Sequence, residues 1–160
     1  MTDPTGLSGV DKITLFSAWG LIRKDLDIHG RNILLLLFQQ HPEYLAYFDF
    51  SDDTTALSLV DNKSLFSQSI LAIKTFGALI EYGLEDAVLF HETLRKVGRW
   101  HGNIQARDVL IIGNVLLAYL KQALGRQAPT TLDEAFRNLF VTISNRFPTR
   151  AEASSASDPI

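Results

Sequence analysis

The stretch NKSLFSQSILAIKTFGALIEY, residues 62–82, repeats apolar side chains at helical spacing. Its positions i, i+3, i+7, i+11 and i+14 share one face of a helix: Leu65, Gln68, Ala72, Phe76 and Leu79. A glycine follows at position 83, where it suits the end of a helix. We therefore predict a long helix over about 62–82 with one face turned to a core.

The same spacing continues on both sides of this stretch. We predict a first helix starting at Ser8, with Ser8 and Asp11 as a capping box, and a last helix starting at a second box, Thr131 and Glu134. The other predicted helices cover 31–40, a short segment through Tyr47, 85–100 and 108–125, and the polar segment 51–61 is predicted to be a loop. No strand-like alternation occurs. The predicted fold class is all-α, with six long or medium helices plus short ones.

Length and charge restrict the class of protein. The chain has 160 residues, enough for one domain, which we place at 1–147, with an Ala/Ser-rich tail at 148–160 that we expect to be disordered. The net charge of −3 argues against nucleic acid as a partner. There are no cysteines, which excludes disulfides and thiolate metal sites. No leader and no apolar run of about 20 residues is seen, so we expect a soluble, cytoplasmic protein without a membrane partner.

One histidine stands out by its position. Phe90, Leu94, Val97 and His101 share one helical face, so His101 ends an apolar stripe. Taken alone, such a histidine is more often a hydrogen-bonded core residue than a ligand. It lacks a second histidine at helical spacing for a bare metal ion, but one imidazole suffices for haem iron, because the porphyrin supplies four ligands. The other three histidines are predicted to be solvated or capping residues: His29, His41 and His91.

Several segments, in order, resemble the globin family over most of the chain. They are Trp19, the apolar run at 33–38, the His-Pro-Glu corner at 41–43 with Tyr47-Phe48, and the stretch LRKVGRWH at 94–101. The resemblance implies a globin fold around haem b, iron protoporphyrin IX.

The resemblance also implies roles for individual residues. His101 would be the axial iron ligand, Phe48 the aromatic stacked on the haem, Leu34 a distal contact, and Leu94 and Val97 proximal contacts. Phe50 is a further candidate, although the spacing after Phe48 departs from the family. Lys63 and Arg107 are candidate partners of the haem propionates, although plain surface cations are the favoured interpretation.

The distal position departs most from the family, because no histidine lies between 42 and 90. One alignment places Gln68 there, with Ala72 one turn later, Ile73, Phe76, Leu79 and Ile80 buried, and small Ser69 at a close helix crossing. The other places Ser69 there and would bury Lys74 and Glu81 as unpaired charges, each costing several kcal/mol. Packing therefore favours Gln68, whose amide can donate a hydrogen bond to O2 but is a poor iron ligand.

The expected function is reversible O2 binding, as carrier or store, at a five-coordinate ferrous haem that also takes CO and NO. The alternatives are a haem enzyme acting on NO, nitrite or peroxide, a gas sensor, or a haem-free helical module. Gln68 cannot accept and return a proton, which disfavours peroxide chemistry. NO dioxygenation would need an external reductase. The sequence leaves the oligomeric state open, with a homodimer possible.

Overall fold

The computed structural model describes residues 5–47, 63–100 and 104–147. Within these ranges the chain forms helices and no strands, which confirms the all-α prediction. The elements in order are α1 (Gly9–Ile22), η1 (Arg23–Asp25), α2 (Leu26–Gln40), η2 (Pro42–Tyr47), α3 (Lys63–Glu81), η4 (Gly83–Glu85), α4 (Ala87–Trp100), α5 (Ala106–Leu124), η5 (Gly125–Gln127) and α6 (Leu132–Arg146).

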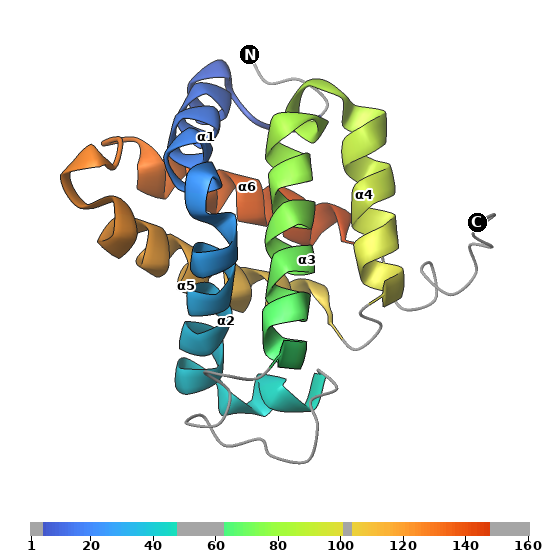
Figure 1. The fold of residues 1–160 in the computed structure, drawn as a ribbon. Coiled ribbons are helices and arrows are strands. Elements are labelled where there is room, and N and C mark those ends of the chain that lie inside the picture. The colour runs from blue at the N-terminus through green and yellow to red at the C-terminus, as the bar shows by residue number, and fades with distance from the viewer. Residues whose placement is uncertain (1–4, 48–62, 101–103, 148–160) are drawn as a thin grey trace.

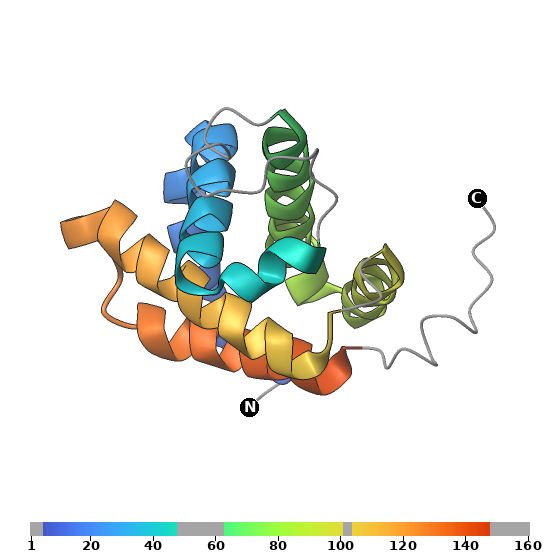
Figure 2. The same cartoon turned by 90° about the horizontal axis from the view of Figure 1, so that it is seen from below.

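The helices form two crossing layers. In Figure 1, α2, α3 and α4 stand upright, while α5 and α6 run across behind them. Figure 2 shows α5 and α6 side by side along one edge, with η2 lying between α2, α3 and α5. In this arrangement α3 is flanked by α2 on one side and α4 on the other.

The helix starts only partly follow the predicted capping pattern. Ser8 and Asp11 form the predicted box, with Asp11 N donating to Ser8 Oγ at 3.1 Å. The second predicted box is wrong: Thr131 makes no capping bond, because its hydroxyl is hydrogen-bonded to the Thr14 hydroxyl of α1. An unpredicted cap instead starts α5, where Asp108 Oδ2 accepts from the Gln105 backbone N–H at 2.9 Å.

The second helix begins earlier than predicted, at Leu26 rather than position 31. Gly30 therefore lies inside α2, where it meets α3. A Cβ placed on Gly30 would lie 2.9 Å from the backbone oxygen of Ser69. The close crossing expected at Ser69 is thus present, and its partner is Gly30.

The interior contains two apolar clusters. The larger one joins all six α-helices, with Ile33 as the member from α2. The smaller one lies between α2, η2, α3 and α5, and its buried members are Leu34, Leu37, Phe38, Tyr44, Leu65 and Val115. We call it the α2–α5 cluster below.

Polar contacts tie α6 to the first helix. Asn138 Nδ2 donates to Asp11 Oδ2 at 3.2 Å, and the Arg146 guanidinium donates to the Thr5 carbonyl at 2.9 Å. These bonds fix the position of the first described segment relative to the last one.

Helix α5 continuing into η5, Ala106–Gln127, is long and apolar enough to cross a membrane by length and composition alone. Buried core helices pass the same test, and in this fold α5 packs against α6 and α2. We accordingly treat it as a core helix.

Candidate functional site

The core face of α3 is open halfway along the helix. Leu65 is fully buried, Leu79 is 4% exposed, and Ala72 lies midway between them. At about 100° per residue, Ala72 points within about 20° of both leucines. Nevertheless Ala72 is exposed. The helix therefore presents a buried face with an uncovered centre.

Gln68 lies one turn before Ala72, at the edge of this opening. Its side chain is half-buried, and its Nε2 donates to Ser64 Oγ at 3.1 Å. Ser64 precedes Gln68 by one turn on the same helix, so this bond stabilises one orientation of the amide.

The side chains that entered the choice between Gln68 and Ser69 as distal residue lie as follows in the structure. Ser69 is fully buried against Gly30, and its Oγ donates to the Phe66 carbonyl at 2.8 Å. Lys74 is exposed. Glu81 is half-buried and accepts a hydrogen bond from Trp19 Nε1 at 3.1 Å. Neither charge is buried without a partner.

Helix α4 loses its cover toward its C-terminal half. Phe90 and Leu94 are each 1% exposed and belong to the larger cluster, whereas Val97 is half-buried. Leu94 therefore behaves as a core residue with no open surface. Of the two predicted proximal contacts, Val97 is the one with surface available in this packing.

On the other side of α3, Leu34 belongs to the α2–α5 cluster together with Leu65. It is 8% exposed, so it forms part of a packed wall. Leu34, the predicted distal contact, is thus an apolar side chain of α2, and Gly30 lets α2 pack closely against α3.

One buried polar contact near this wall is absent from the sequence predictions. Tyr44 of η2 donates from its hydroxyl to Asp108 Oδ1 of α5 at 2.7 Å, and the residues are 3% and 4% exposed. The other carboxylate oxygen, Oδ2, accepts from the Gln105 backbone N–H at 2.9 Å. Only the capping pattern at Gln105 could have pointed to Asp108.

Comparison with known proteins identifies the family. The family model described as Globin matches residues 31–147, well over half of the chain. The chain belongs to the globin family. It is similar to Extracellular globin-E1 of Artemia sp., at 25% identity over 144 residues, which cover 89% of this chain and 71% of the relative.

The fold of this globin also matches a solved structure. The neighbour is described as a hexacoordinated heme protein from an anhydrobiotic tardigrade, with a TM-score of 0.80 and 18% identity, covering 96% of this chain and 99% of that one. At that identity the likeness supports the fold alone.

Two of this globin's predicted haem contacts, Phe48 and His101, lie outside the described residues, as does Phe50. The two candidate propionate partners, Lys63 and Arg107, are described and exposed. Within the described ranges, no group of three or more His, Asp or Glu side chains gathers as a metal site.

The remaining histidines differ from one another. His91 is exposed, as predicted. His41 follows α2 as its C-cap residue and lies 3.4 Å from Glu43. His29 was expected to be solvated or capping, but it is half-buried, and its Nδ1 lies 2.7 Å from the Tyr119 hydroxyl of α5. His29 therefore links α2 to α5.

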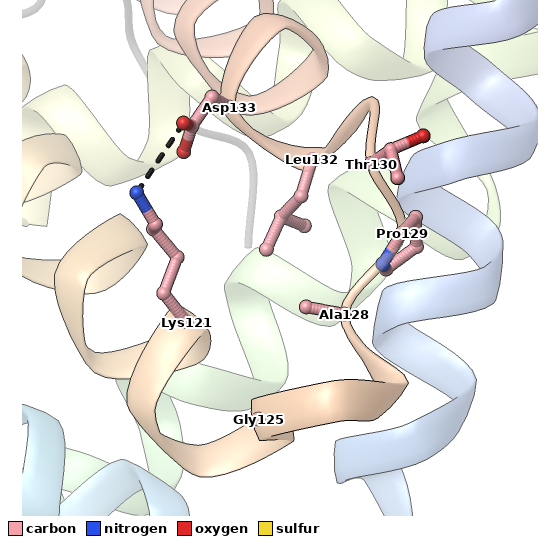
Figure 3. Close-up of a pocket in the computed structure, with 7 residues that line it drawn as sticks. All are labelled: Lys121, Gly125, Ala128, Pro129, Thr130, Leu132 and Asp133. Carbon is pink, nitrogen blue, oxygen red and sulfur yellow. Dashed lines mark hydrogen bonds and ion pairs between the residues drawn. The ribbon is translucent and has the colours of Figure 1, made fainter.

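A separate pocket of about 150 Å³ lies at the connection between α5 and α6 (Figure 3). The ion pair of Lys121 with Asp133, 3.3 Å long, crosses it, and Leu132 and Pro129 also line it. It lies at the opposite side of the globin from α4 (Figure 1). It is thus distinct from the open face of α3.

Proposed function

We propose that this globin binds a haem against α3 and α4 and uses it to bind O2 reversibly. The observation that carries the proposal is the exposed Ala72, which lies midway between the buried Leu65 and Leu79 on one face of α3. An apolar face that the chain itself leaves uncovered gains free energy when a flat apolar group covers it, at about 25 cal/mol per Å² buried. A small side chain at that centre leaves room for such a group.

The residues present fit a haem. Val97 offers a half-buried apolar surface on α4, and Ala72 offers an open one on α3. His101 follows Val97 by four positions in the sequence and is the imidazole we assign as axial ligand. The haem would supply the iron that binds O2, CO or NO. We expect haem b, because the chain lacks cysteines for covalent attachment.

In this proposal Gln68, on α3, donates a hydrogen bond to the O2 bound at the haem. Its amide can donate a hydrogen bond to a ligand that gains negative charge, and its hydrogen bond to Ser64 limits how far it can turn away. A carboxamide is a poor iron ligand, so we expect a five-coordinate ferrous state. It also does not titrate, so ligand affinity should depend weakly on pH through this residue.

The test is an absorption spectrum of the purified ferrous protein after addition of haem, with and without O2 and CO. We expect a Soret band, a five-coordinate ferrous spectrum, and a reversible change with each gas. His101→Ala should lose haem retention, while the matched variant His91→Ala, at an exposed position of α4, should keep it. No Soret band, or equal retention in both variants, would overturn the proposal, and a six-coordinate ferrous spectrum would overturn the role of Gln68.

A further inference from the structure

The hydrogen bond between Tyr44 and Asp108 joins segments that are 64 residues apart in the sequence, at 2.7 Å. Both side chains are almost fully buried, so water does not compete for this bond. An ionised carboxylate makes a stronger acceptor than a neutral group, and a buried acceptor that loses its donor is costly. The contact therefore holds η2 and the start of α5 together tightly.

Each end of this bond is anchored by a further contact. The Tyr44 ring belongs to the α2–α5 cluster, which contains Leu34 and Leu65. Asp108 sits in the first turn of α5 and accepts from the Gln105 backbone, which fixes that turn. Along the chain, Phe48 follows Tyr44 by four positions and His101 precedes Asp108 by seven.

We propose that Tyr44 and Asp108 form a positioning pair, which sets the placement of the α5 start, and hence of the chain that bears His101, relative to the distal wall. The inference rests on the proposed function for its consequence at the haem. Its structural basis lies in described residues alone: the hydroxyl, the carboxylate, the cluster and the helix cap. Removing the hydroxyl leaves the cluster packed but frees the first turn of α5 to shift.

The test compares Tyr44→Phe with Thr14→Val. Tyr44→Phe deletes the hydroxyl and keeps the buried ring. Thr14→Val deletes another hydroxyl, which is hydrogen-bonded to Thr131 at the start of α6, and neither threonine belongs to the α2–α5 cluster. Both variants lose one hydrogen bond between elements, so a purely structural role would make them behave alike.

Three measurements separate the variants. In the ferrous protein, the iron–histidine stretching frequency in resonance Raman spectra should shift in Tyr44→Phe and stay at the wild-type value in Thr14→Val. The rate of haem loss should rise about tenfold in Tyr44→Phe only. In the haem-free protein, hydrogen exchange should accelerate in the first turn of α5, residues 106–109, in Tyr44→Phe only.

Asp108→Asn keeps the side-chain volume and supplies a second variant if Tyr44→Phe fails to fold. Once its one oxygen accepts from Gln105, only an uncharged, reversed bond from the amide N–H to the Tyr44 hydroxyl can replace the original bond, so the same three quantities should change in the same direction by a smaller amount. The positioning pair would be overturned if Tyr44→Phe kept the wild-type iron–histidine frequency and the wild-type rate of haem loss. It would also be overturned if Thr14→Val changed these quantities as much as Tyr44→Phe does. A wild-type protein that takes up no haem would instead overturn the proposed function, and unchanged exchange at 106–109 would then overturn the pair as well.

Discussion

Gly30 and Ser69 bring the backbones of α2 and α3 into contact. A Cβ on Gly30 would lie 2.9 Å from the Ser69 carbonyl oxygen and 3.0 Å from Ile73 Cγ2. Leu34, one turn after Gly30, is thereby held in the same cluster as Leu65 of α3. The distal wall of the proposed pocket therefore depends on the absence of one side chain.

Gly30→Ala should destabilise the protein by about 1–3 kcal/mol, because the added methyl group presses on backbone that cannot rotate away. Gly20→Ala is the matched control, since nothing lies within 4 Å of its Cβ and it also sits inside a helix. It should stabilise by about 0.5–1 kcal/mol. Urea unfolding measures the free energy of unfolding of both variants. A Gly30→Ala protein as stable as Gly20→Ala would contradict the close crossing of α2 and α3.

Ala72→Trp should fill the open centre of the α3 face. We expect far-UV circular dichroism like that of the wild type, with haem retention reduced at least tenfold in a titration with haem. Leu71→Trp adds the same ring one position away, where the side chain is 65% exposed, and should leave haem retention unchanged. Equal haem uptake by both variants would place the cofactor elsewhere.

Gln68→Leu should remove the donor on the α3 side while keeping the bulk of the side chain. Losing one hydrogen bond of about 0.5–1.5 kcal/mol should speed O2 dissociation roughly two- to tenfold. CO binding should change less, because CO gains little negative charge. Stopped-flow measurement of both off-rates provides the check, and equal effects on the two gases would argue against a hydrogen-bonding role for Gln68.

Asp11→Ala should cost more stability than the loss of a helix cap alone. Asp11 accepts from the Ser8 backbone and from Asn138 of α6, so its removal affects two elements. We expect about 2–3 kcal/mol, against about 1 kcal/mol for Asp86→Ala, which removes a bond to the Leu89 backbone at an exposed helix start. Thermal unfolding of both variants measures the difference, and similar melting temperatures would show that the Asn138 bond contributes nothing.

Periodicity was sufficient to predict the all-α class and the long helix that the structure shows as α3. The choice of Gln68 over Ser69 as distal residue depends on Lys74 and Glu81, because the register with Ser69 would bury both charges. In the structure Ser69 is buried and Lys74 is exposed, while the assignment of Gln68 as distal residue stays a prediction. Helical spacing alone fixes how two residues of one helix lie relative to each other, so such patterns can be predicted from the sequence.

Contacts between distant segments could not be predicted in the same way. The spacing of Thr131 and Glu134 resembles a capping box, but Thr14 of another helix competes for the Thr131 hydroxyl. The predicted helix over 31–40 leaves Gly30 out, whereas the structure places Gly30 inside α2 in close contact with α3. The bond from Tyr44 to Asp108 has no local sequence signal on the tyrosine side, because its partner is far along the chain.

The link between Asp11 and Asn138 spans 127 residues and has a consequence for synthesis. At about 5–20 residues per second, the first helix leaves the ribosome roughly 6–25 seconds before its hydrogen-bonding partner on the last one. Throughout that interval Leu15 and Trp19, buried in the finished molecule, lack part of their cover. A nascent chain is therefore most prone to aggregate, and to be bound by chaperones, until α6 has been synthesised.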